Sequence, residues 1–192
     1  MFYVDLFSAL ARHKVDYLLI GGLAVSLHGV ERATMDVDIT VAMNPDNLAA
    51  LIDAAKELKL SPVLPVPLES LGDLELLRQW HAERHLEVFA LRNADLAGVT
   101  VDVLLFPPVE FSGMASRADV FKVANTVIQV VSIQDAMKID FPRGDRTYYV
   151  SDERLRAFRQ LTPEQKLRWV EELATFLRMA KISREKSQEI LK

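Results

Sequence analysis

The chain has 192 residues, of which 50% are hydrophobic and 26% charged, a balance typical of globular proteins. It contains no cysteine, which excludes disulfides, thiolate zinc sites and cysteine nucleophiles. No apolar run approaches the roughly 18 residues of a membrane span. The first residues also lack the pattern of a signal peptide, so we expect a cytoplasmic protein with no membrane partner.

The net charge of -4 is unevenly distributed along the chain. Residues 151–192 carry 10 Lys/Arg against 7 Asp/Glu, so the acidic excess lies in residues 1–150. An acidic body argues against passive nucleic-acid binding. It is compatible with a carboxylate-rich metal site, where divalent ions supply the positive charge.

Up to about residue 106, helical and strand patterns alternate. Residues 17–20 form an apolar run that stops at Gly21-Gly22, which is typical of a buried strand followed by a tight turn. Three prolines make residues 61–72 an irregular loop. The expected elements are helices at 4–14 and 23–28, a strand at 36–43, a helix from Asn44-Pro45-Asp46 to about 58, a helix at 73–84, and strands at 86–92 and 99–106, which could pair as a hairpin.

Helices dominate after two further short strands at 120–123 and 126–131. Thr162, Pro163 and Gln165 carry the signature of a capping box. The expected elements are a helix at 132–140 with Ser132 as N-cap, a loop at 141–149, a helix from Ser151, a helix from Pro163 to about 179, and a last helix after Ser183. We therefore predict an α+β fold in which a core at 1–131, a mixed sheet with flanking helices, precedes a helical region at 132–192.

Two acids in one strand carry the first chemical signal. Asp36 and Asp38 are two residues apart, so their side chains share a face with Cα atoms about 6.6 Å apart. Like carboxylates this close repel each other unless a cation lies between them. Magnesium is usually held by one or two carboxylates together with substrate phosphates.

A third acid, Asp102, lies in the otherwise apolar and β-branched run at 99–105. If that strand lies beside the strand of Asp36, three carboxylates converge in a cluster that suits two metals about 3.5–4 Å apart. The Gly21-Gly22 turn would let the backbone approach a phosphate closely at a helix N-terminus.

Together these residues resemble a known superfamily. Ile20-Gly21-Gly22, Ala24, His28-Gly29, Arg32, Thr34 and Asp36-Val37-Asp38 are similar to the signature of the DNA polymerase β-like nucleotidyltransferases, in the form of their small prokaryotic branch. That branch includes minimal nucleotidyltransferases and toxins of abortive-infection and toxin–antitoxin systems. The resemblance covers residues 17–42, and extends to Asp102 and to 132–138.

The resemblance implies a nucleotidyltransferase fold and an Mg²⁺- or Mn²⁺-dependent enzyme that moves a nucleoside monophosphate from an NTP to an acceptor hydroxyl. It implies that Asp36 and Asp38 hold both metals and that Asp102 completes the second metal site and helps activate the acceptor. Gly21 and Gly22 would seat the triphosphate. Arg32, Thr34 and Lys138 would be further substrate-binding residues, with Lys138 near the phosphates.

The acceptor stays open between a tRNA end, a protein and a small molecule, and a cognate protein partner is also conceivable. Arg143 and Arg146 follow the lysine helix but do not align with the Arg-containing turn of many relatives. The chain is also shorter than the larger toxins. A catalytically silent relative that binds a nucleotide or a protein is the alternative.

Plainer interpretations exist for single residues. The two strand acids could face water, Asp102 could lie on a wet face, Arg32 and Thr34 could brace the loop, and Lys138 could be solvated. His28 is expected to pack or hydrogen-bond locally. His81 and His85, four apart on a helix, lack the glutamate of the zinc motif, so exposed helix residues are the expectation. Leu167, Val170, Ala174 and Leu177, with Trp169, Leu173 and Phe176 beside them, form a stripe that indicates a core or partner-binding face.

Overall fold

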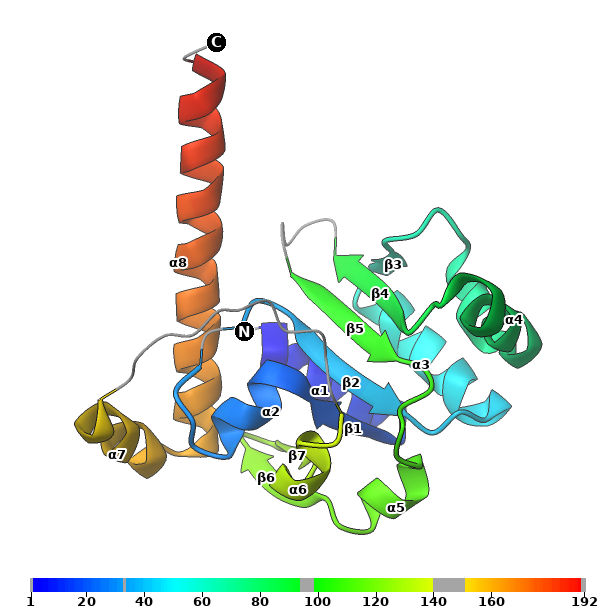
Figure 1. Cartoon of the computed structure of the whole chain (residues 1–192), viewed down its shortest axis with the longest axis horizontal. Coiled ribbons are helices and arrows are strands. Elements are labelled where there is room, and N and C mark those ends of the chain that lie inside the picture. The colour runs from blue at the N-terminus through cyan, green and yellow to red at the C-terminus, as the bar shows by residue number, and fades with distance from the viewer. Residues whose placement is uncertain (1, 33, 94–98, 140–150, 191–192) are drawn as a thin grey trace.

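A seven-stranded mixed sheet with helices around it forms the body of the protein (Figure 1). The computed structural model describes residues 2–32, 34–93, 99–139 and 151–190, with backbone only at 178 and from 180 onward. The predicted α+β class is confirmed. The strand order is β3-β4-β5-β2-β1-β7-β6. The strands are β1 (Tyr17–Ile20), β2 (Val37–Val41), β3 (Leu60–Pro62), β4 (Val88–Asn93), β5 (Thr100–Leu104), β6 (Asp119–Val123) and β7 (Thr126–Val130).

The two faces of the sheet carry different helices. Leu6 of α1 (Phe2–Arg12) and Leu51 of α3 (Pro45–Glu57) line one small apolar space together with Ile39 and Val101. Side chains alternate between the two faces along a strand, so Asp38, next to Ile39, and Asp102, next to Val101, lie on the opposite face. The helix α2 (Gly21–Leu27) packs against β1 and β2, and it also contacts α6 (Ile133–Ala136).

Most of the predicted elements are present. The strand at 17–20 is confirmed with the same bounds, and 86–92 and 99–106 pair as the antiparallel hairpin β4–β5. Ser132 caps α6, Ser151 caps α7 (Asp152–Gln160), and Thr162 and Gln165 bond to each other's backbone N–H at the start of α8 (Pro163–Ile190). Local capping chemistry therefore located these helix starts correctly.

Four expectations need correction. Residues 61–72 are not wholly irregular, because they contain the end of β3 and the short helix η1 (Leu68–Gly72). α2 begins at Gly21 itself, and α6 is a single turn that is shorter than the predicted 132–140 helix. α8 continues through Ser183 without a break. The expected loop at 141–149 lies outside the described residues. The helix α4 (Leu74–Arg84) matches its prediction. The short helix α5 (Phe111–Ala115) has no counterpart among the predicted elements.

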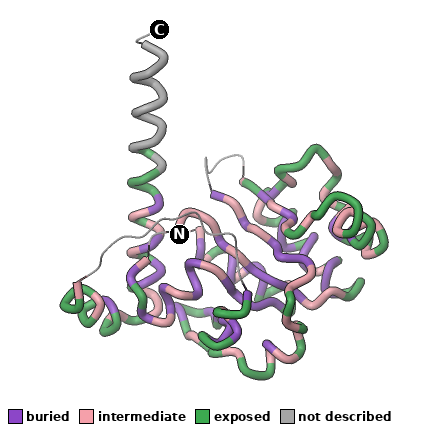
Figure 2. Tube along the Cα trace, viewed as in Figure 1, coloured by how far each residue is buried: buried purple, intermediate pink, exposed green. Residues whose placement is uncertain are grey.

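The C-terminal helices pack against the end of α2 and the loop that follows it. Buried Lys166 donates from Nζ to the carbonyl of Leu27 at 3.2 Å, and buried Glu31 forms an ion pair with Arg154. Phe158 and Trp169 contact each other edge to face, which holds α7 against α8. Beyond these contacts α8 extends away from the body (Figure 1), and its described side chains between Thr175 and Met179 are exposed (Figure 2).

Candidate functional site

One edge of the sheet gathers the residues that the sequence singled out. β1 and β7 run parallel and end at this edge, as shown by the pair Leu19 and Val130. β2 runs antiparallel to β1, so its start meets the end of β1, where Ile20 pairs with Asp38. β5 is parallel to β2 and also begins here. One edge of the sheet therefore carries the glycine turn, by which we mean Gly21 and Gly22 at the start of α2, together with the starts of the two acid-bearing strands and of α6.

Asp38 and Asp102 lie directly opposite each other in the neighbouring strands β2 and β5. The two acid-bearing strands are therefore neighbours, which is the condition for their acids to converge, and the spacing of adjacent strands places the two Cα atoms about 5 Å apart. Thr100, two residues before Asp102, donates its hydroxyl to Asp36 Oδ1 at 2.9 Å, which ties the third carboxylate to the same place. Asp102 Oδ1 is buried without a hydrogen-bond partner.

Two of the three carboxyl groups, Asp38 and Asp102, are harder to ionise than usual. Burial, aided by the negative charges of Asp102 and Asp36, raises the pKa of Asp38 to about 6. A backbone hydrogen bond from Gly22 and the positive charge of Arg32 act in the opposite direction. Burial also raises the pKa of Asp102, with a further contribution from Asp36, while the Thr100 hydroxyl opposes it. The cluster is short of positive charge, and a bound cation would relieve it.

The two glycines are required by close contacts. Gly21 has φ +67°, and a Cβ there would lie 2.0 Å from Asp38 Oδ2. A Cβ at Gly22 would lie 3.0 Å from Thr34 Cβ and 3.5 Å from Arg32 Nε. The Gly-Gly pair therefore brings the N-terminus of α2 against both the carboxylates and the following loop.

That loop is braced from within. Ser26 donates its hydroxyl to the carbonyls of Gly22 and Arg32, at 3.1 and 3.0 Å. Thr34 donates to the carbonyl of Asp36 at 3.2 Å. The hydroxyl of Thr34 thus serves the loop in this structure, whereas the side chain of Arg32 lies near enough to Asp38 to lower its pKa.

Lys138 is placed by a carboxylate that the sequence analysis did not single out. Its Nζ lies 3.1 Å from Oδ1 of the fully buried Asp135, and Arg117 Nε and Nη2 lie 3.0 and 2.9 Å from Oδ2. Burial opposes ionisation of Asp135, but the bonds from Lys138, Arg117 and Ser132 outweigh it and lower the pKa. In the sequence Asp135 has the pattern of a helix-capping residue after Ser132. Arg117 is 18 residues away, so no local pattern predicts that the two side chains meet.

The histidines are explained by packing. His28 Nε2 lies 2.8 Å from the carbonyl of Val131, and its ring meets Phe121 edge to face. The expected packing is present, but the hydrogen bond spans 103 residues and is not local. His81 lies on Phe106 and its Nδ1 is 3.2 Å from the Leu86 carbonyl, and His85 is the left-handed C-cap of α4. Neither arrangement is that of a zinc site.

Among the residues described, no group of three or more His, Asp or Glu side chains is already arranged as a metal site. Two of the three carboxylates are instead turned to protein donors, Asp36 to Thr100 and Asp38 to the Gly22 N–H. The donor set nonetheless fits a hard divalent cation, because it consists of carboxylate oxygens and includes the unpartnered Asp102 Oδ1. Asp36, Asp38 and Asp102 are therefore the residues that could hold Mg²⁺ or Mn²⁺.

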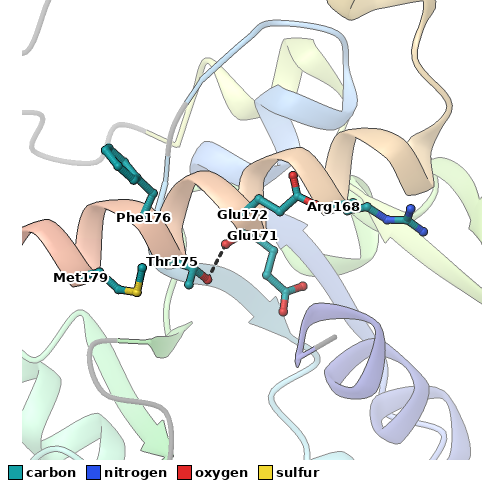
Figure 3. Close-up of a pocket in the computed structure, with 6 residues that line it drawn as sticks. All are labelled: Arg168, Glu171, Glu172, Thr175, Phe176 and Met179. Atoms are coloured by element: carbon teal, nitrogen blue, oxygen red, sulfur yellow. Dashed lines mark hydrogen bonds between the residues drawn. The ribbon is translucent and has the colours of Figure 1, made fainter.

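A hollow elsewhere on the surface is lined by residues of α8 alone. Arg168, Glu171, Glu172, Thr175, Phe176 and Met179 surround it (Figure 3). It shares no residue with the carboxylate cluster. Among the described residues, Phe176 and Met179 are about 60% exposed, at 62% and 61%, which is unusual for such large apolar side chains.

No family model matches the chain, and no curated protein matches it either. Within the part of the chain that the structure describes, none of the helices combines the length and the apolar character that crossing a bilayer requires.

Proposed function

We propose that this protein is a metal-dependent nucleotidyltransferase that transfers a nucleoside monophosphate from an NTP to an acceptor hydroxyl. The observation that carries the proposal is the pairing of Asp38 with Asp102 in adjacent strands, directly beside the glycine turn. Asp36 joins them through Thr100. Converging carboxylates supply the ligands for divalent cations, and a glycine turn at a helix start supplies N–H groups for phosphates.

The chain's own residues have distinct parts in this reaction. The acceptor oxygen attacks the α-phosphorus, the bond from that phosphorus to its bridging oxygen breaks, and pyrophosphate leaves. Asp102, whose pKa is raised by burial, accepts the proton of the hydroxyl. Asp36 and Asp38 would hold Mg²⁺ or Mn²⁺, which neutralises the charge of the triphosphate when bound. Gly21 and Gly22 would orient the triphosphate for this attack.

The proposal specifies the acceptor only as a molecule that carries a free hydroxyl group. An RNA end such as that of a tRNA, a protein hydroxyl and a small molecule all offer the required group. A role in a toxin–antitoxin or defence system follows from the resemblance in residues 17–42 and would bring a cognate protein partner. An acceptor screen with a radiolabelled NTP separates these classes by the size of the labelled product.

Calorimetric titration of ATP, CTP, GTP and UTP, each with and without Mn²⁺ or Mg²⁺, tests the proposal directly. We expect at least one NTP to bind only with metal, and the Asp36→Ala/Asp38→Ala variant to lose that binding. Circular dichroism of the variant should show an unchanged fold, since both side chains lie at the start of a strand. Equal, metal-independent binding by the wild type and the variant would contradict the proposal.

Metal binding should depend on pH through Asp38. Its carboxyl has a pKa of about 6 without a cation, so protons compete with the metal below that value. The affinity for Mn²⁺ should be constant at neutral pH and fall by up to about tenfold per pH unit below pH 6. Titrations at pH 5, 6, 7 and 8 measure this. A constant affinity down to pH 5 would show that Asp38 is not a ligand.

A protein-binding role is the second candidate, and the exposed end of α8 favours it. Phe176 and Met179 lie next to the hollow in Figure 3, on a helix that extends from the body. A silent relative would use this face and bind no NTP. The same titrations decide between the two functions, because only the enzyme requires metal-dependent NTP binding that Asp36 and Asp38 support.

A further inference from the structure

A compact ionic cluster, formed by Arg117, Asp135 and Lys138, lies at the same sheet edge as the carboxylates. Asp135 is 0% exposed, while the side chains of Arg117 and Lys138 are 52% and 59% exposed. Ser132 adds a hydroxyl bond to Asp135 Oδ2 at 3.2 Å. A buried carboxylate thus holds two cations that face solvent, and the cluster has one excess positive charge.

The cluster lies within reach of a nucleotide on the glycine turn. β1 lies between β2 and β7, so two strand spacings, about 10 Å, separate the start of β2 from the end of β7. The N–H of Val131, at the end of β7, donates to the carbonyl of Leu19 at 3.0 Å, which fixes α6 beside the Gly21 turn. β6 begins next to the end of β7, where Asp119 pairs with Val130, and Arg117 lies two residues before Asp119.

The guanidinium of Arg117 is held in place by Asp135, but this contact does not use all of its hydrogen-bond donors. Its backbone N–H donates to the carbonyl of Met114 at 3.0 Å, so the residue is anchored at the end of α5. The donors to Asp135 are Nε and Nη2, and Nη1 lies at the other end of the planar group. Lys138 likewise has three donors, one of which contacts Asp135. Each cation keeps donors for an anion.

We infer that Arg117, positioned by Asp135, is a triphosphate-binding residue that contacts the β- and γ-phosphates, the part that leaves as pyrophosphate. The inference rests on the proposed function and adds a residue to its site. Planar guanidinium groups suit phosphate oxygens because they offer paired donors. Asp135 contacts no substrate in this arrangement and is a positioning residue, since it orders both cations before the nucleotide arrives.

The test compares nucleotides that differ only in the β- and γ-phosphates. Titrations with Mn²⁺ of each NTP and its NMP are made with the wild type, Arg117→Met, Arg117→Lys and the control Arg78→Met, which removes an exposed arginine of α4. We expect Arg117→Met to weaken NTP binding roughly tenfold and NMP binding less than twofold. Arg117→Lys should recover part of the loss, and Arg78→Met should bind like the wild type.

Loss of Arg117 leaves Asp135 with fewer partners, so the folding of each variant is checked by thermal melting. If Arg117→Met does not fold, the Arg117→Met/Asp135→Asn variant gives the same NTP-to-NMP comparison without the buried charge. Wild-type NTP binding that Arg117→Met leaves unchanged, or an equal loss for NTP and NMP, would overturn the inference alone. Absence of metal-dependent NTP binding by the wild type would instead overturn the proposed function, and the inference with it.

Discussion

Asp38→Asn should abolish nucleotidyl transfer and at the same time stabilise the protein. The amide keeps the shape of the side chain and can still accept the hydrogen bond from the Gly22 N–H, but it carries no charge. We expect transfer to fall about a thousandfold or more, because a carboxylate ligand to the metal is lost. We expect the free energy of unfolding to rise by about 1–2 kcal/mol at pH 7 without metal.

The sign of the stability change follows from the pKa of Asp38. Its pKa in the folded protein is about 6, above the ordinary 3.8, so the folded state holds the proton more tightly than the unfolded state. Stability from this group is therefore present below about pH 4 and is lost as the pH rises to 6. The amide of the Asp38→Asn variant does not ionise, so its gain over the wild type should be small at pH 4 and complete by pH 7.

Urea unfolding at pH 4, 5, 6 and 7, in the presence of a chelator, measures this difference. Asp53→Asn on the exposed face of α3 is the matched control, and its stability should follow that of the wild type. Added Mg²⁺ should raise the melting temperature of the wild type and leave Asp38→Asn nearly unchanged. A variant that is less stable than the wild type at pH 7 would show that the charged Asp38 is held by interactions stronger than the burial and carboxylate repulsion that oppose its ionisation.

The acidic centre of the site could be predicted from the sequence because its signals are local. The spacing of Asp36 and Asp38 fixes a common face, and the apolar run around Asp102 marks a second buried strand. The acids converge only if those strands are neighbours, and the register of Asp38 with Asp102 meets this requirement. Because side chains alternate faces every second residue, Asp36 and Asp38 are placed on one face even when the predicted bounds of the strand are wrong by a residue or two.

The cationic side of the site could not be predicted in the same way. Arg117 reaches Asp135 across a strand hairpin, and no period in the sequence links the two. The role of Lys138 came only from the resemblance, and the structure adds that Asp135 holds its side chain. The substrate-binding assignments of Arg32 and Thr34 stay predictions, since Thr34 already serves the loop.

The C-terminal helices show a similar limit. Capping residues predict the starts of α7 and α8 correctly, but the separate helix predicted after Ser183 is wrong, because α8 continues through that residue. The apolar stripe is confirmed as core at Leu167, Val170 and Ala174, where α8 meets the body. Farther along, Leu177 of the same stripe and the neighbouring Phe176 are exposed, because the body ends there and periodicity cannot show where the contact between α8 and the body stops.

Gly21→Ala should damage both stability and transfer, and it tests the contact at the centre of the site. The new Cβ would lie 2.0 Å from Asp38 Oδ2, and the positive φ of +67° disfavours any L side chain. We expect a loss of about 2–3 kcal/mol in the free energy of unfolding, from backbone strain and displacement of Asp38. Transfer should fall about a hundredfold, because the carboxylate is moved by roughly 1 Å.

Two further variants separate the causes of that damage. Gly72→Ala is the control away from the site, since its φ is not in the left-handed region and its Cβ would meet only the end of the Ile52 side chain, Cδ1 at 3.2 Å. In the Asp38→Ala background, Gly21→Ala should cost less, because Oδ2 and Cγ are gone and the Cβ of residue 38, 2.8 Å away, is the contact that remains. An equal cost in both backgrounds would assign the whole effect to the backbone. It would then remove Gly21 as the residue that makes room for the carboxylate.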